Sequence, residues 1–222
     1  MRISLPEIDA RRLLVPGPVV LVTTRWHGAD NIMPLAWATP LALEPPLVGI
    51  AVHPTRHTHD MISHAQEFAL NIPGRDLVNH VHYFGLVSGR EIDKLDAARL
   101  PTFAARKVDA RLLDHCLGWI ECGVEDAYGM GDHTLFVGRV VAVQVEEDAF
   151  DGTWKLEDPD YRPLHYLGGS SYALSSTRIE AKLESPDEHA LHEALEEQLE
   201  LQAEEQAKQE ASEAERVERE GQ

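Results

Sequence analysis

Five polar residues with the chemistry of an anion-binding site stand beside turns and expected helix starts. They are Arg56, Thr58, Ser88, Arg90 and Lys94. Guanidinium and ammonium groups, hydroxyls and the free amides of a helix N-terminus together form a phosphate site. Each residue taken alone also suits a helix cap or a surface charge. Taken together, they predict recognition of a phosphorylated ligand.

Two other kinds of chemistry find less support. Four histidines fall within residues 53–64, and His80 and His82 follow. Their spacing matches no zinc or iron motif, so the sequence predicts no metal site. Ser63 and Ser88 lack the Gly-x-Ser-x-Gly surroundings of a serine nucleophile.

The stretch 31–39, Asn-Ile-Met-Pro-Leu-Ala-Trp-Ala-Thr, has an unusual composition for a strand. It follows an apolar run at 19–24 and a break that contains Gly28, which together predict a β-hairpin. Pro34 cannot donate a hydrogen bond, so the second arm should lie at a sheet edge or carry a bulge. Its small residues would let a flat ligand approach the backbone N–H and C=O groups. An edge strand with a packing tryptophan, Trp37, explains the same residues without a ligand.

Short strands separated by turns account for most of the chain before residue 170. A helix is expected at 59–66, with Thr58 as its N-cap, and another at about 75–87. Further strands are expected at 47–52, 68–72, 117–124 and 134–145. Strands and helices do not alternate regularly, and no Gly-x-Gly-x-x-Gly follows a strand, so a Rossmann sheet is disfavoured. An antiparallel β-barrel with peripheral helices fits best.

Charge and composition narrow the possible partners. The 222 residues carry a formal net charge of −18 and show no basic patch, so a nucleic-acid partner is not expected. No apolar run approaches the length of a membrane span, and the N-terminus resembles no signal peptide. Cys116 and Cys122 suit neither a zinc knuckle nor a Cys-x-x-Cys pair. We therefore expect a cytoplasmic protein with reduced cysteines.

The C-terminal segment 180–222 differs in kind from the rest. It contains 15 acidic and 4 basic residues and is rich in Glu, Ala and Gln. This composition favours a local helix, while the high net charge argues against a packed core. We predict a domain at 1–179 followed by an acidic tail, helical or disordered, that is solvated or binds a partner.

Eight segments, in order, resemble the flavin reductase-like, FMN-binding split-barrel family, and the flavoredoxin branch most of all. The resemblance extends over roughly residues 13–173. The matching segments are 17–24, 31–40, 45–48, 56–58, 68–73, 88–94, 131–138 and 163–168.

This resemblance implies a mainly β, antiparallel split β-barrel that forms a homodimer, with one FMN per subunit near the dimer interface. It also implies an oxidoreductase that moves hydride or electrons between NADH or NADPH and flavin or another acceptor. Flavin carries out the hydride chemistry, and the protein supplies orientation and electrostatics.

The resemblance implies roles for individual residues as well. Backbone groups along the stretch 31–39 would face the flavin ring, at Met33, Ala36, Trp37, Ala38 and Thr39. The phosphate and ribityl chain would be held by Arg56, His57, Thr58, Ser88, Arg90 and Lys94. The expected cofactor-binding set is completed by Asn31, Asn71, Gly89 and Tyr166. His133, in Gly-Asp-His, matches the position where related reductases place a histidine beside flavin and nicotinamide, and is the expected catalytic residue.

Two alternatives use the same site residues, and a third relies on the acidic tail instead. A flavoredoxin-like protein would keep its FMN and reduce a partner protein. An FMN protein could instead act on a small unsaturated carbonyl compound, with His133 or Trp37 near the substrate. A non-redox protein would act through its acidic tail. Pro34 and Trp37 replace the small residues of many NAD(P)H:flavin reductases, and Trp37 would narrow the face that nicotinamide uses.

Overall fold

The computed structural model of this protein describes residues 4–14 and 16–181. Residues Met1–Thr177 make up one compact unit, and Arg178 begins a second. The predicted acidic tail at 180–222 lies outside the described residues, apart from Glu180 and Ala181. The domain boundary at residue 179 therefore stays a prediction.

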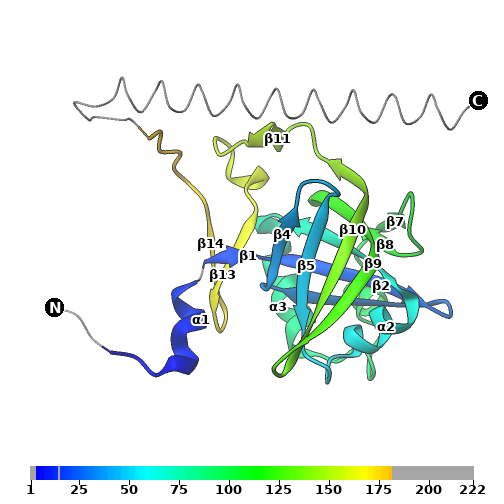
Figure 1. Cartoon of the computed structure of the whole chain (residues 1–222). Helices are drawn as coiled ribbons and strands as arrows, with labels where there is room; N and C mark the ends of the chain where they lie inside the picture. The colour runs from blue at the N-terminus through cyan, green and yellow to red at the C-terminus, as the bar shows by residue number, and fades with distance from the viewer. Residues whose placement is uncertain (1–3, 15, 182–222) are drawn as a thin grey trace, which may run out of the picture. The chain divides into compact units, whose positions relative to one another are not determined.

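Seven strands form one sheet in which every neighbouring pair is antiparallel. Figure 1 shows the sheet wrapped into a barrel-like body, with short helices on its outside. This arrangement confirms the expected mainly β, antiparallel fold. In spatial order the strands are β3 (Ala29–Leu35), β2 (Val20–Trp26), β6 (Glu67–Pro73), β9 (Cys116–Met130), β10 (His133–Val145), β5 (Leu47–Val52) and β4 (Ala38–Ala42).

The two edge strands of this sheet, β3 and β4, are consecutive in the chain. Only Ala36 and Trp37 separate them, and the pairings among the described residues do not join β3 to β4. The sheet is thus connected across its edges by the chain and not by a hydrogen-bonded ladder, which leaves a split at residues 36–37. The Trp37 carbonyl accepts a hydrogen bond from the Ala51 amide at 3.0 Å. Pro34 lies on edge strand β3, as expected of a proline in a sheet.

Short elements complete the described unit. Helix α2 packs against β2, and α3 packs against β3. The helices are α1 (Ala10–Leu13), α2 (His57–Ala65), α3 (Val78–Leu86) and α4 (Lys94–Ala98), with 3₁₀ turns at Glu7–Asp9, Arg75–Leu77 and Pro159–Tyr161. The small sheets combine β1 (Gly17–Pro18) with β13 (Leu164–Gly168) and β14 (Ser171–Leu174), β7 (Thr102–Ala104) with β8 (Arg111–Leu113), and β11 (Phe150–Asp151) with β12 (Thr153–Trp154).

Two apolar clusters hold the sheet, one on each side of β2. Val20 and Val22 belong to one cluster, whereas Leu21 between them belongs to the other. Successive side chains of a strand point to opposite faces, so a strand buried on both faces has a continuous apolar sequence. Gly138 allows the close packing of the first cluster, because a Cβ there would lie 2.5 Å from Cζ of Phe68.

The start of α2 corrects one expectation. The helix begins at His57, and Arg56 is its N-cap residue with extended backbone angles. Thr58 was the predicted N-cap, but it lies within the first turn, where its hydroxyl accepts a hydrogen bond from Asn31. Within the described residues, no helix has both the length and the apolar character needed to cross a membrane.

Candidate functional site

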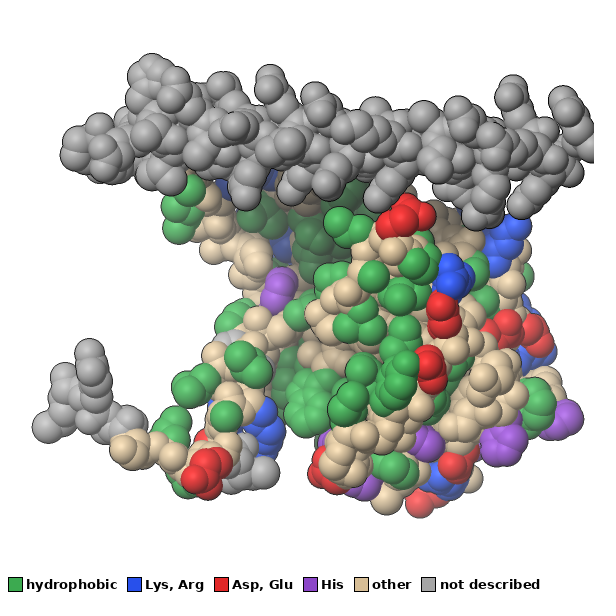
Figure 2. Space-filling view, viewed as in Figure 1, with side chains coloured by type: hydrophobic (Ala, Val, Ile, Leu, Met, Phe, Trp, Pro, Cys, Tyr) green, Lys and Arg blue, Asp and Glu red, His purple; other side chains and the backbone are tan. Residues whose placement is uncertain are grey.

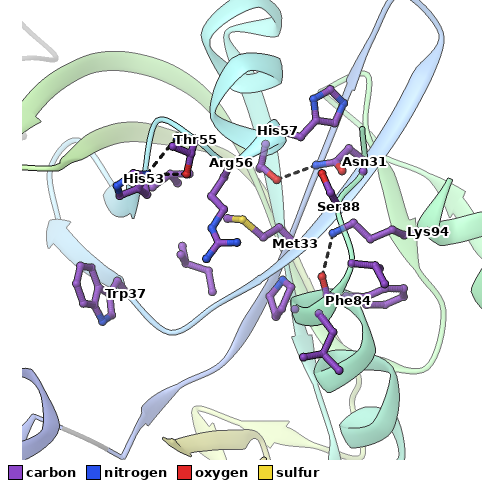
Figure 3. Close-up of a pocket in the computed structure, with 18 of the residues that line it drawn as sticks. Asn31, Met33, Trp37, His53, Thr55, Arg56, His57, Phe84, Ser88 and Lys94 are labelled. Atoms are coloured by element: carbon purple, nitrogen blue, oxygen red, sulfur yellow. Dashed lines mark hydrogen bonds between the residues drawn. The ribbon is translucent and has the colours of Figure 1, made fainter. Parts of the chain in front are cut away.

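A cavity of about 560 Å³ opens beside the split between β3 and β4. Figure 3 shows side chains from several elements converging on it. One part of its wall is β3 with residues 36–37, and another is the end of β5 with the loop that leads into α2. The end of α3 with residues 87–89 forms a third part, and Lys94 and His133 complete the wall. Its volume lies within the range of small-molecule and cofactor sites.

Open backbone forms one side of the cavity. Ala36 and Trp37 lie in the gap between the edge strands, and Trp37 is 47% exposed. Met33 and Pro34 continue this side along β3. Because Ala36 is small and lies outside the strand pairings, a flat ligand can approach the backbone here.

The N-terminus of α2 forms another side. Arg56, His57 and Thr58 all line the cavity, and the first amides of a helix have no partner within the helix. The positive end of the helix dipole favours an anion at this point. Nδ2 of Asn31 donates to Oγ1 of Thr58 at 2.7 Å, which ties β3 to the helix start.

His57 contributes a neutral ring. Burial, with help from the nearby Arg90, lowers the pKa of His57 below its ordinary value. Nδ1 of His57 is buried, and no described residue makes a hydrogen bond to it. A neutral ring with an unpaired, buried nitrogen therefore lies in the cavity wall beside the start of α2.

Lys94 is the most unusual charge in the cavity. It is only 5% exposed, and its Nζ donates to the Phe84 carbonyl at 2.9 Å. Burial, and to a lesser extent Arg56, lowers the pKa of Lys94 to about 8. The residues that line the cavity include no Asp or Glu. A desolvated ammonium beside a guanidinium, with no carboxylate between them, creates a strong preference for an anion.

Gly89 allows two walls to meet. A Cβ at this position would lie 2.1 Å from Oδ1 of Asn31 and 3.1 Å from Cδ2 of His57. Any larger residue must therefore displace Asn31, which holds the start of α2. Ser88 lies next to it on the cavity wall, and its Oγ accepts from the Arg90 amide at 3.2 Å.

Aromatic and imidazole rings gather near His133. The ring of His133 lies 4.7 Å from that of Trp37 and 5.2 Å from that of His53, measured between centroids. Nδ1 of His133 lies 2.6 Å from Oδ1 of Asp132, and this hydrogen bond lowers the pKa of Asp132. The carboxylate orients the ring and leaves Nε2 as the nitrogen that can meet a substrate.

The structure thus brings most of the expected site residues to one cavity. The expected residues that line it are Asn31, Met33, Ala36, Trp37, Arg56, His57, Thr58, Ser88, Gly89, Lys94 and His133. His53 and Thr55 line it as well, and the sequence had not singled them out for this site. The apolar helix end 84–87 is a further addition, and its only signal was its place directly before Ser88.

Arg90 lies behind the wall and not on it. Its Nη1 donates to the Thr55 carbonyl at 2.8 Å, and its Nη2 pairs with the Asp60 carboxylate. Arg90 therefore joins the loop before α2 to the helix itself and supports the position of Arg56.

Four other expected residues lie away from the cavity wall. Asn71 is fully buried, where its amide bonds to the Leu21 carbonyl, the Thr23 hydroxyl and the Leu113 amide. These bonds use the side chain to join β2, β6 and β8. The others are Ala38 and Thr39, which pair with β5, and Tyr166, which lines two neighbouring cavities.

Known proteins resemble this chain over most of its length. The sequence profile of the family described as "Flavin reductase like domain" matches residues 11–175. The uncharacterized protein YddH of Escherichia coli (strain K12) is 34% identical over 178 residues, which cover 78% of this chain and 94% of YddH.

Two solved structures share the fold closely. The FMN-binding protein from Thermus thermophilus with bound 1-cyclohex-2-enone is 30% identical, with a TM-score of 0.70 over 82% of this chain and 97% of that one. Flavoredoxin from Methanosarcina acetivorans is 25% identical, with a TM-score of 0.73 over 86% of this chain and 99% of the flavoredoxin.

Proposed function

This chain belongs to the flavin reductase-like family, and we propose that it is an oxidoreductase that holds FMN in the cavity beside Trp37 and takes hydride from NADH or NADPH. The observation that carries this proposal is that two cations, Arg56 at the start of α2 and buried Lys94 at the start of α4, line the same cavity as the open backbone at 36–37. Such a cavity suits a ligand with a phosphate at one end and a planar ring at the other.

The residues present fit FMN. Arg56, Lys94 and the first amides of α2 would hold the phosphate, with the Ser88 hydroxyl and the neutral ring of His57 beside it. The backbone near Ala36 and the exposed ring of Trp37 would contact the isoalloxazine. When bound, FMN supplies the chemistry that accepts a hydride and passes two electrons on.

His133 would act where the donor and the acceptor enter. Asp132 fixes the ring of His133, and Trp37 packs against it. An oriented imidazole can hold a proton next to the site of hydride transfer. Trp37, in contact with this ring, would limit the directions from which a nicotinamide can approach.

A second candidate is the reduction of small unsaturated carbonyl compounds. Such a reduction needs a hydride from the reduced cofactor and a proton for the substrate, and the Asp132–His133 pair offers a histidine placed to deliver that proton. The similar Thermus thermophilus protein has 1-cyclohex-2-enone bound in its crystal structure. The carbonyl compound and the nicotinamide would then use the same open side of the cavity in turn.

We also propose that the protein is a homodimer. Exposed apolar side chains lie on β10 and on β4 with the residue that follows it: Leu43, directly after β4, is 93% exposed and Val143 is 61% exposed, and Leu41, Val141 and Val145 are exposed as well. Figure 2 shows hydrophobic side chains gathered over β4, β5 and β10. An apolar patch of this kind favours a protein partner. Val143→Asp should shift the protein from dimer to monomer in light scattering after gel filtration.

One anaerobic experiment tests the proposed reaction. The full-length protein is saturated with FMN, separated from free flavin, and titrated with NADH and then NADPH while the flavin absorbance is followed. Bleaching by either nucleotide supports the proposal, and recovery of the absorbance on addition of 1-cyclohex-2-enone supports the second candidate. A protein that retains no flavin contradicts the cofactor assignment. Retained flavin that neither nucleotide bleaches contradicts the donor and favours electron transfer from a partner protein.

A further inference from the structure

A second cavity lies against the one proposed to hold FMN, the cofactor cavity. Its volume is about 580 Å³, and Ala36 and Trp37 line both cavities. The remaining wall comes from α1, from the end of β13 and from Gly169 in the turn that follows β13. Figure 2 shows a hollow between the N-terminal segment and the barrel. A molecule in the cofactor cavity could extend past Trp37 into this space.

The second cavity has a cationic side. Arg11 and Arg12 line it, and no Asp or Glu does. Oδ1 of Asp9 forms an ion pair with Nε of Arg12 at 3.1 Å. Among the described residues, no other carboxylate forms an ion pair with Arg11 or Arg12. Arg11 and the two terminal nitrogens of Arg12 therefore have no acidic partner among the described residues, and both arginines line the cavity. Guanidinium groups of this kind recognise phosphate oxygens in pairs.

The same cavity has an aromatic side. Trp37 and Tyr166 both line it, and Gly168 and Gly169 beside them add no side-chain bulk. Aromatic side chains provide flat faces on which a nucleobase stacks. Arginines and flat rings in one cavity are the chemistry that an adenosine phosphate needs.

We infer that this second cavity holds the adenosine-phosphate half of the dinucleotide donor, and that Arg11 and Arg12 select NADPH over NADH by binding its 2′-phosphate. The inference rests on the proposed function, in which the nicotinamide half enters the cofactor cavity past Trp37. NADH lacks the 2′-phosphate, so it gains less from these two arginines.

The first test measures binding and not catalysis. Adenosine 2′,5′-bisphosphate and 5′-AMP are titrated by calorimetry into the full-length protein with FMN in excess, so that Arg56 and Lys94 are already occupied. We expect the wild type to bind the bisphosphate at least tenfold more tightly than 5′-AMP. Arg11→Ala with Arg12→Ala should abolish that preference. Arg106→Ala is the matched control, because it removes an exposed arginine that lines neither cavity.

The second test uses the reaction. In the double variant, kcat/KM for NADPH should fall at least tenfold relative to kcat/KM for NADH. The uncharged donor 1-benzyl-1,4-dihydronicotinamide should reduce wild type and double variant at the same rate. Equal binding of the two nucleotides by the wild type, or an unchanged preference in the double variant, overturns the inference. A wild-type protein that holds no flavin overturns the proposed function instead, and bisphosphate binding then still decides the role of the arginines.

Discussion

The two ends of the cofactor cavity both carry basic side chains, but they place them in opposite environments. At one end Lys94 is buried, bonded to the Phe84 carbonyl and next to the start of α2. At the other end His133 pairs with Asp132, whose side chain is 79% exposed, and contacts the exposed ring of Trp37. A desolvated, fixed cation suits a ligand that stays, whereas an open, oriented imidazole suits substrates that come and go. The difference supports the proposal that the phosphate of FMN binds at the Lys94 end and that substrates meet the His133 end.

Among single substitutions, the largest effect is expected from Gly89→Ala at the buried end. The new Cβ collides with Oδ1 of Asn31. The Nδ2 of the same side chain donates to Thr58 and so fixes the start of α2. Overpacking of this kind typically costs about 1–3 kcal/mol, so the dissociation constant for FMN should rise about tenfold to a hundredfold. Fluorescence titration measures the dissociation constant for FMN. Gly129→Ala is the control, because a Cβ there meets nothing within 4 Å; equal behaviour of the two variants would contradict the close contact at Gly89.

The pH dependence of FMN binding should show the buried lysine directly. Without FMN, the pKa of Lys94 is lowered to about 8, so its charge is present below pH 8 and lost above it. A bound phosphate favours the charged form. FMN affinity should therefore be flat between about pH 7, where the phosphate is fully charged, and pH 8, and fall by up to about tenfold per pH unit above it. Lys94→Met should remove this dependence, and a wild-type titration that stays flat to pH 10 would count against the assignment.

The same pKa has an opposite consequence for the FMN-free protein. The folded chain loses the Lys94 proton at a pKa of about 8, whereas the unfolded chain keeps it up to the ordinary value of 10.5. Between these values the unfolded state binds more protons, so the contribution of Lys94 makes the folded state more stable as the pH rises through this window. Urea unfolding at pH 7.5 and pH 9.5 measures the free energy of unfolding of wild type and Lys94→Met. Between these two pH values it should rise more in the wild type than in the variant.

The smallest effect is expected at the exposed end. Asp132→Ala removes the acceptor that orients His133 but touches none of the phosphate-binding groups. Reduction of the substrate should slow by about two- to tenfold, because an exposed pair contributes only modestly. The dissociation constant for FMN should stay within about twofold. Stopped-flow measurement of the reduction rate and titration with FMN, made on the same sample, distinguish the roles of the two ends of the cavity. A variant with much weaker FMN binding would contradict the assignment of separate roles to them.

Local sequence signals predicted the strands and the residue types of the site. The hairpin at β2 and β3 follows from a β-branched run, a Gly28 break and an edge proline. Arg56, Ser88 and Lys94 could be predicted because cations and hydroxyls beside turns have few other uses in combination. Each of these signals lies within a few residues of the element or turn that it marks.

The contacts that depend on distant residues could not be predicted in the same way. Arg90 turns to Asp60, and the Asn71 amide satisfies backbone groups on two other strands. Nothing local distinguishes these side chains from ligand-binding ones. The apolar residues 84–87 line the cavity only because α3 ends there. Lys94 could be predicted as a cation, but its burial required the fold.

The most direct test compares FMN with riboflavin, which lacks the phosphate. Dissociation constants are measured for both flavins with wild type, with Arg56→Ala combined with Lys94→Met, and with the control Lys107→Met, an exposed lysine outside the cavity. We predict that the double variant binds FMN at least about a hundredfold more weakly, since two charged hydrogen-bonding groups are lost, while riboflavin binding changes by less than about threefold. Wild-type FMN affinity in the double variant, or equal loss of both flavins, would contradict the phosphate site at the start of α2.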